Sequence, residues 1–210
     1  RHADELLTRQ QTHGLLDTLK EKSPKAVEDV VPTIINVGDL QRVMQNLLKE
    51  RVPIRDLETI LETLADWAPR TKDTDVLTEY ARHALARTIC QMYKDDKNVI
   101  RVVTIDPKIE DLINGNVERN ERSSFLNLAP QTQSKLVGLI REQVDKAIAN
   151  SGGQSIAVLC SPQVRMWVRR MIESTMPQTP VLSFNEVVRG IEVSSLGIVV
   201  FKDEPQNVPG

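Results

Sequence analysis

Residues 94–105 read KDDKNVIRVVTI, and a change of period inside this stretch decides the fold. Residues 94–98 are polar throughout, whereas residues 99–105 are rich in β-branched side chains and too short and dense for an amphipathic helix. Upstream of the stretch, apolar residues recur at helical spacing. We therefore expect a domain boundary here, between a helical part and a part that contains a sheet.

The segment before this boundary is predicted to be helical. Leu40, Val43, Met44 and Leu47 have the spacing of one helix face, and Asp39 is the expected cap of that helix. Further apolar faces predict a helix that begins at or after Pro53 and one long helix over residues 75–92. Residues 23–95 are therefore expected to form an all-helical unit, and residues 1–22 the tail of an upstream subdomain.

The segment after the boundary alternates between strand and helix patterns, which favours a parallel or mixed sheet. Residues 114–127 are polar and predict an exposed, mobile loop. The fold class is therefore α+β or α/β, with an all-helical N-terminal unit followed by a small α/β domain over residues 96–210 whose sheet has about four strands. The expected elements are strands at 99–105, 155–160 and 181–184, a strand or hairpin at 191–200, and helices at 109–113, 130–150 and 161–174.

Composition excludes several classes of function. The formal net charge is −2 and aromatic residues make up 3%, so neither a global electrostatic field nor a base-stacking surface favours nucleic acid. Cys90 and Cys160 are predicted to be reduced thiols in a reducing compartment. No apolar run approaches the ~20 residues of a membrane helix, and residues 1–11 lack a signal-peptide core. Because the chain begins without Met inside a helical pattern, we expect it to be a piece of a longer protein.

Candidate chemistry is sparse. The three histidines have no Cys or His partner at metal-ligand spacing, so we expect neither a metal nor another cofactor. Cys160 ends a predicted strand just before a predicted helix, where a thiol pKa can fall, yet no histidine follows it, and a buried structural cysteine is the preferred interpretation. Arg165, Arg169 and Arg170, with Trp167, predict a basic patch on the 161–174 helix that could bind nucleic acid or acidic partners. A solvated helix face or a protein contact is the preferred interpretation, because the net charge is close to zero.

The run VPIRDLETILETLAD, residues 52–66, resembles a signature of the FHIPEP family, the large export-gate proteins of bacterial type III secretion. The opening residues 2–10, HADELLTRQ, are most similar to the flagellar members of that family, while residues 114–127 and 187–190 do not match it. The other matching segments are EDVVP at 28–32, LLKE at 47–50, HALAR at 83–87 and VLSFNE at 181–186.

This resemblance implies a function in protein secretion and flagellum biogenesis without catalysis. It implies a parent protein anchored in the bacterial inner membrane by a missing N-terminal region, with cytosolic subdomains that form a nine-membered ring at the cytoplasmic face. That ring would dock export chaperones with their substrates and contact other export-apparatus proteins. The chain would then contain the end of the first subdomain, the helical third and the α/β fourth. Thr12 would lie at the edge of the chaperone-docking site, and Arg55, Asp56 and Glu62 at a subunit interface.

Two rival functions remain open from the residues alone. Residues 39–68 could form a helix-turn-helix of a nucleic-acid-binding regulator, whose affinity would fall steeply with salt. Alternatively, Cys160 could be the nucleophile of a thiol enzyme, which predicts its selective alkylation at neutral pH.

Overall fold

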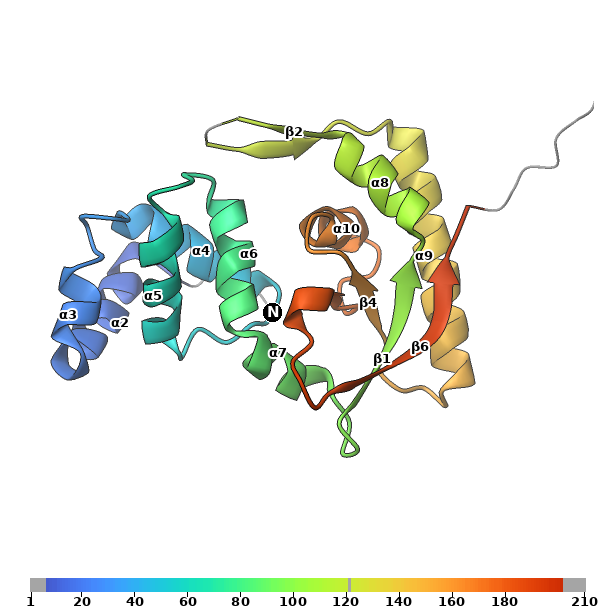
Figure 1. Cartoon of the computed structure of the whole chain (residues 1–210), viewed down its shortest axis with the longest axis horizontal. Helices are drawn as coiled ribbons and strands as arrows, with labels where there is room; N and C mark the ends of the chain where they lie inside the picture. Colours follow the sequence, from blue (N-terminus) through green and yellow to red (C-terminus); the bar gives the residue numbers. More distant parts are fainter. Residues whose placement is uncertain (1–6, 121, 202–210) are drawn as a thin grey trace, which may run out of the picture. The chain divides into compact units, whose positions relative to one another are not determined.

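The computed structural model describes residues 7–120 and 122–201. It contains two compact units (Figure 1). The helical unit is Arg1–Met92 with Glu118–Phe125 and Asn185–Arg189, and the sheet unit is Tyr93–Val117, Leu126–Phe184 and Gly190–Gly210. The predicted fold class, helices first and then a small α/β part, is confirmed. The division into segments 1–22, 23–95 and 96–210 stays a prediction.

Side-chain caps define most helix starts in the helical unit. Asn36, Asp56 and Asp73 each accept a hydrogen bond from a backbone N–H of the first turn. The predicted cap Asp39 is wrong, because the helix already begins at Val37 and the Asp39 N–H donates to the Asn36 side chain at 2.9 Å. The helices in sequence order are α2 (Arg9–Lys22), α3 (Pro24–Glu28), α4 (Val37–Lys49), α5 (Leu57–Trp67), α6 (Thr74–Ala84) and α7 (Ala86–Tyr93).

The single helix predicted over residues 75–92 is interrupted. Leu85 caps α6 with ψ of 12°, outside helical geometry, and α7 begins at the next residue. Ala81, Leu85 and Ile89 are all buried, so the apolar period runs across the break, and the sequence carries no signal of it.

The core of the helical unit is aliphatic, as the low aromatic content implies. Trp67 stacks on Tyr80, with ring centroids 3.7 Å apart, and Arg70 lies over the same indole ring. The side chains that are buried on α4, α5 and α6 are Leu40, Val43, Met44, Leu47, Leu57, Ile60, Leu61, Leu64, Leu77 and Ala81.

The sheet unit is built on a four-stranded parallel sheet with strand order β5-β4-β1-β6. In its register, Val103 of β1 lies opposite Val158 of β4 and Gly197 of β6. The segment 191–200 is therefore one strand rather than a hairpin. The elements are β1 (Val99–Ile105), α8 (Pro107–Gly115), α9 (Pro130–Asn150), β4 (Ala157–Cys160), α10 (Arg165–Ile172), β5 (Val181–Ser183), the 3-10 helix η1 (Phe184–Glu186) and β6 (Glu192–Val199).

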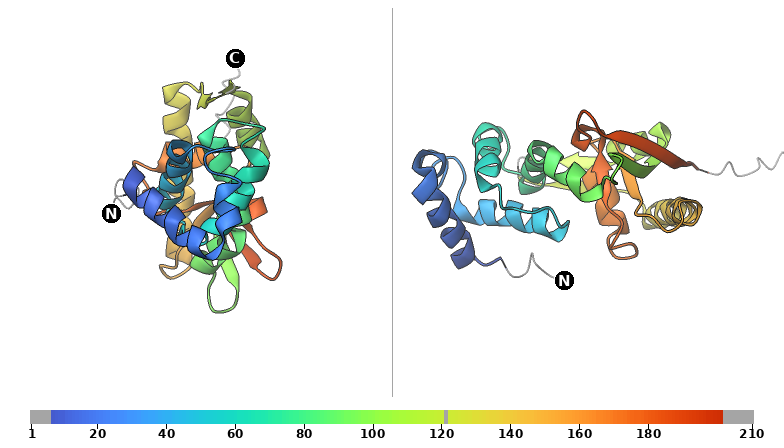
Figure 2. Two further views of the ribbon diagram at one scale, coloured as in Figure 1. Left: turned by 90° about the vertical axis from the view of Figure 1, so that its left-hand side faces the viewer. Right: turned by 90° about the horizontal axis from the view of Figure 1, so that it is seen from below.

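Helices α8, α9 and α10 cover one face of this sheet. Val103, Val158 and Val199 point into one cluster with Ile113 of α8 and Ile140 of α9, and α9 is seen nearly end-on beside the strands in the right-hand view of Figure 2. The predicted helix stop at residues 151–153 is confirmed, since α9 ends at Asn150. Gly152 and Gly153 then adopt positive φ, which glycine accepts without steric cost.

Residues 114–127 do not form the predicted loop. They contain the paired strands β2 (Val117–Arg119) and β3 (Ser124–Leu126). Asn120 organises the turn between them, because its side-chain oxygen accepts hydrogen bonds from the Ser123 and Arg122 N–H groups at 2.9 and 3.0 Å. Composition alone indicated a loop since each strand is only three residues long and most of its neighbours are polar or charged.

Candidate interaction surface of the helical unit

The loop between α4 and α5 sets the position of Arg55. At the end of α4 the Val52 N–H donates back to the Leu47 carbonyl at 2.9 Å, which turns the chain out of the helix. Asp56 then starts α5 as its cap, accepting from the Thr59 N–H at 3.3 Å. Arg55 is the last residue before this cap and its side chain is exposed. Arg55 and Asp56 were both predicted to lie at a subunit interface. Asp56 also has a structural role, because it caps α5.

Arg55 lines an open pocket of about 440 Å³ together with a second arginine, Arg87 of α7. Arg87 is exposed, whereas Ile89 and Cys90 on the opposite side of α7 are buried. Within the described residues, neither guanidinium forms an ion pair or a side-chain hydrogen bond. We call this site the basic pocket, and its lining residues are Pro53, Arg55, Arg87, Thr88, Gln91 and Met92.

The exposed face of α5 carries the opposite charge. Glu58, Glu62 and Asp66 follow one another at intervals of four residues, so they lie along one side of the helix, and all three are exposed. In the part of the chain that the structure describes, none of the three carboxylates has a cationic partner. We call these three residues the acidic row. Glu62, predicted at the subunit interface, is its middle member.

Thr12, the candidate for the docking edge, is fully buried in α2 at 0% exposure. Its hydroxyl donates to the Thr8 carbonyl one turn earlier, at 3.0 Å. Any effect of Thr12 on docking would therefore act through the position of α2 rather than through direct contact of the hydroxyl. Its role in docking stays a prediction.

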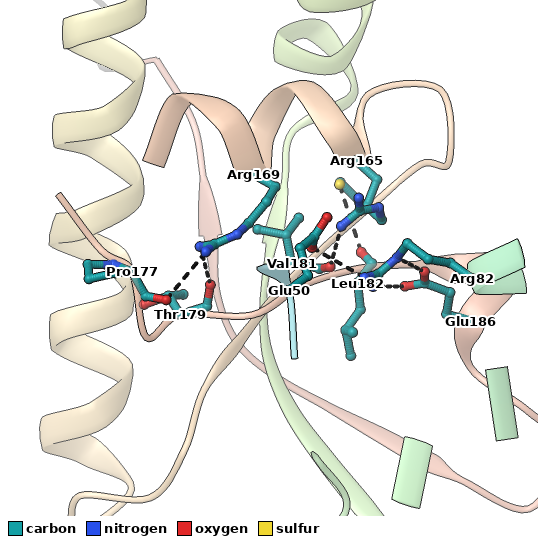
Figure 3. Close-up of polar contacts among 10 residues, drawn as sticks. Glu50, Arg82, Arg165, Arg169, Pro177, Thr179, Val181, Leu182 and Glu186 are labelled. Carbon is teal, nitrogen blue, oxygen red and sulfur yellow. Dashed lines mark hydrogen bonds and ion pairs between the residues drawn. The ribbon is translucent and has the colours of Figure 1, made fainter. Parts of the chain in front are cut away.

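A buried charge cluster that local sequence patterns do not predict lies inside the helical unit (Figure 3). Arg82 of α6 donates from Nε to Glu186 Oε1 at 2.6 Å and from Nη2 to Oε2 at 3.2 Å, and its Nη1 lies 3.2 Å from Glu50 Oε2. The Cys90 thiol donates to the Glu186 carbonyl at 2.9 Å. Burial raises the pKa of Cys90, so this thiol stays protonated at neutral pH.

The basic patch predicted on residues 161–174 is wrong. Arg165 is 0% exposed and donates from Nη1 to the Val181 carbonyl at 3.1 Å, while Arg169, at 9%, donates to the carbonyls of Thr179 and Pro177 (Figure 3). These two arginines satisfy backbone carbonyls inside the sheet unit. Only Arg170 is exposed, and it lies over the Trp167 ring at 5.3 Å.

The structure gives Cys160 no access to a substrate. The side chain is fully buried, with Sγ 3.8 Å from the Leu182 carbonyl. Helix α10 begins at Arg165 rather than directly after the strand, so Cys160 does not lie at its first turn. Across the described ranges, no three His, Cys, Asp or Glu side chains are grouped closely enough to hold a metal ion.

No helix among residues 7–120 and 122–201 combines the length and apolar character that crossing a bilayer requires. Glu79 and His83, which lie four residues apart on α6, are half-buried and exposed respectively.

Comparison with known proteins places these features in a family. The FHIPEP family profile matches residues 1–192. The flagellar biosynthesis protein FlhA of Bacillus subtilis is 41% identical over 198 residues, which cover 94% of this chain and 29% of that protein. The invasion protein InvA of Salmonella typhimurium is 34% identical over 187 residues, covering 89% of this chain and 27% of InvA. The chain thus spans less than a third of the length of these relatives.

Solved structures agree with the sequence comparison. The CdsV protein of Chlamydia pneumoniae superposes with a TM-score of 0.86 at 29% identity, over 94% of this chain and 56% of that chain. Nonameric SctV-C from EPEC, solved by cryo-EM, superposes with a TM-score of 0.82 at 31% identity, over 94% of this chain and 58% of that chain.

Proposed function

Since this chain belongs to the FHIPEP family, we propose that it is a cytosolic part of a bacterial protein-export gate, and that it works there as a ring-forming docking platform for export chaperones and their substrates. The work is done by surfaces, without catalysis or a cofactor. The parent protein holds this part at the cytoplasmic face of the inner membrane through regions outside this chain.

The observation that carries the proposal is the match of 94% of the chain, at a TM-score of 0.82, to a relative solved as a nonamer. In a closed ring of identical subunits, each subunit has two different surfaces, and one surface of each subunit binds the other surface of its neighbour. The exposed Arg55 and Glu62, near the start and in the middle of the α5 segment, support placing the subunit contact there. Asp56 orders the same segment as the cap of α5.

Docking of other proteins is the second part of the proposal. A structure of CdsV of Chlamydia pneumoniae with the protein CdsO has been solved, and CdsV matches 94% of this chain at a TM-score of 0.85. That complex supports the binding of another protein by a relative of this chain. Chaperone docking near Thr12 would also need the missing part of the first subdomain, because a single buried side chain offers no docking surface.

A nucleic-acid-binding regulator is the less favoured function. The two arginines Arg165 and Arg169, which offered the best local basic patch, are buried, and the net charge is −2. Among the described residues, two of the three arginines that were expected to contact phosphate are therefore not exposed.

The test is a pull-down with the full parent protein, using flagellar chaperones loaded with their cargo and the same chaperones alone. We expect retention of the loaded chaperones and no retention of duplex DNA in a parallel titration at low salt. A parent protein with Thr12→Ala serves as the local variant, and Thr18→Ala is its matched control, since Thr18 makes the same kind of bond to Gly14 but is exposed. DNA binding without chaperone binding would reverse the proposal.

A further inference from the structure

Strand β6 forms one of the two outer edges of the parallel sheet, beside β1 (Figure 1). The Val199 carbonyl accepts a hydrogen bond from the Asp106 N–H at 2.9 Å, so the polar groups of Val199 point toward the β1 side. Neighbouring residues of a strand point their N–H and C=O groups to opposite sides, so those of Ile198 point away from β1. Among the described residues, no further strand pairs with β6 on that side.

The side chains along β6 are also suited to pairing. Ile198 lies on the face of the sheet opposite Val199, which is buried in the cluster with α9. Residues 193–201 contain no charged residue and no proline, the residues that commonly protect a sheet edge from pairing. The exposed apolar side chains of this segment are Val193, Leu196, Ile198 and Val200, at 36%, 36%, 45% and 39%.

The opposite edge of the sheet is closed. Strand β5 has only three residues, all of them buried, and Pro180 precedes it. The Val158 N–H donates to the Pro180 carbonyl at 2.9 Å, so the Val181 carbonyl points to the outer side. There it accepts a hydrogen bond from the buried Arg165 at 3.1 Å. Across residues 7–120 and 122–201, no side chain does the same for the carbonyl of Ile198.

An open edge of this kind selects an extended chain. The backbone groups of an added strand pair with the outward N–H and C=O groups of β6, and its apolar side chains pack against Ile198 and Val200. Main-chain hydrogen bonds carry little sequence information, so the edge accepts many different sequences. The lack of charge over residues 193–201 favours an uncharged segment, because a charge desolvated there would have no partner on β6.

A second copy of this chain is the less suitable occupant. Edge-to-edge pairing of β6 with β6 of another copy is a two-fold contact, which joins copies in pairs. The ring of the proposed function is nonameric, as in SctV-C, and an odd number of copies cannot all be joined in pairs. The edge is therefore better suited to a chain of a different kind.

We infer that the outer edge of β6 binds an extended, uncharged segment of an unfolded export substrate, which adds a strand to the four-stranded sheet. The inference rests on the proposed function, because that function makes an export substrate the source of the segment. The register of β6 with β1 shifts between Val102 and Val103, so the added strand pairs with the regular part of β6 that begins at Gly197.

A defined peptide tests the edge in this chain. The probe is a fluorescein-labelled peptide, Thr-Val-Thr-Val-Thr-Val, and its fluorescence anisotropy is measured as the chain is added up to millimolar concentration. The control probe is the same peptide with every backbone amide N-methylated, which removes its hydrogen-bond donors but keeps its side chains. We expect the chain to bind the first peptide and not the second.

Variants of one residue locate the peptide on β6. Ile198→Pro removes an outward N–H, a change that edge strands accept because the ladder does not use that group. Ile198→Lys places a charge beside the docked strand. Its matched control is Ile148→Lys, since Ile148 is 37% exposed and lies on α9, which covers the other face of the sheet. Circular dichroism melts first show that each variant is folded, and if Ile198→Pro is not, the two lysine variants decide.

We expect Ile198→Pro to bind the peptide about tenfold more weakly than the unchanged chain and Ile198→Lys about threefold more weakly, while Ile148→Lys binds as the unchanged chain does. The cargo of the pull-down, purified without its chaperone, should displace the peptide. Equal binding by all variants, or no binding by the unchanged chain, overturns the inference. So does peptide binding that the cargo does not displace, or a dimer in sedimentation velocity that Ile198→Pro abolishes.

The proposed function fails separately. Retention of loaded chaperones by the full parent protein does not depend on this peptide, so a lack of peptide binding with that retention overturns the edge site alone. Peptide binding that the cargo displaces, without retention of loaded chaperones, supports the edge site and contradicts the docking of chaperones.

Discussion

Replacing Arg82 by methionine should destabilise the helical unit strongly. The side chains of Arg82 and Glu186 are only 3% and 2% exposed, and two hydrogen bonds of 2.6 and 3.2 Å join them. Methionine keeps much of the aliphatic volume but removes the cation. The Glu186 carboxylate then stays buried beside that of Glu50 without the guanidinium that lay between them.

The expected loss is about 3–5 kcal/mol of unfolding free energy, the usual cost of removing one partner from a buried ion pair. The exposed pair Lys20 and Glu28 at 2.9 Å, which also lies in the helical unit, provides the comparison, and Lys20→Met should cost only about 0.2–1 kcal/mol. Replacing both Arg82 and Glu186 by methionine removes both buried charges together. The double variant should therefore be more stable than Arg82→Met by about 2 kcal/mol or more.

Tryptophan fluorescence during urea unfolding measures these differences. Trp67 stacks on Tyr80 in the helical unit and Trp167 belongs to the core of the sheet unit, so a shared Trp167→Phe background makes the emission report on the helical unit. The effect of the background cancels in the differences between variants. A loss below about 1 kcal/mol for Arg82→Met, or a double variant less stable than the single one, would refute the assignment of a buried, coupled pair.

Three further predictions concern the interior and one acidic side chain. Cys90 and Cys160 should both resist iodoacetamide at neutral pH in the folded protein and react in denaturant, whereas selective labelling of Cys160 would favour a thiol enzyme. Hydrogen bonds from the Val99 N–H and then the Arg101 side chain lower the pKa of Asp95 below 3.8. Its stabilising effect is thus present above that value and is lost as pH falls through the lowered pKa, so the stability difference between Asp95→Asn and the unchanged chain should shrink in acid unfolding series. Leu47→Ala, at a position 0% exposed, should cost about 2–5 kcal/mol in urea unfolding, with little change for the exposed Leu15→Ala.

Local periodicity was sufficient to predict much of the architecture. The β-branched run at 99–105 forms β1, and the helix faces around Leu47 and Leu61 are buried as expected. These features depend on the pattern of apolar residues within a single helix or strand, and this pattern can be seen directly in the sequence. The FHIPEP resemblance, carried by residues 52–66, is confirmed by the family match over residues 1–192.

The positions of charged side chains could not be predicted in the same way. Arg165 and Arg169 are spaced like residues of a solvated helix face, yet they donate to carbonyls of β5 and of the segment just before it. Arg82 and Glu186 are 104 residues apart in sequence, so nothing local links them. Likewise, the sequence alone does not predict that Arg87 and Arg55, 32 residues apart, line the same pocket. Burial of a charge depends on partners distant in sequence, whereas burial of a leucine depends mainly on its own helix face.

The energies of these charges also bear on how the protein assembles. Arg82 is fixed in the interior, while Arg55 and Arg87 remain exposed. Exposed ion pairs contribute only about 0.2–1 kcal/mol each, so a contact built from a few of them is weak between freely diffusing copies. Anchoring to one membrane raises the effective concentration of the copies and can make a weak contact sufficient. We therefore expect this chain to be monomeric in dilute solution and its self-association to require high concentration, and stable rings of the chain at low concentration and high salt would contradict a contact based on exposed charges.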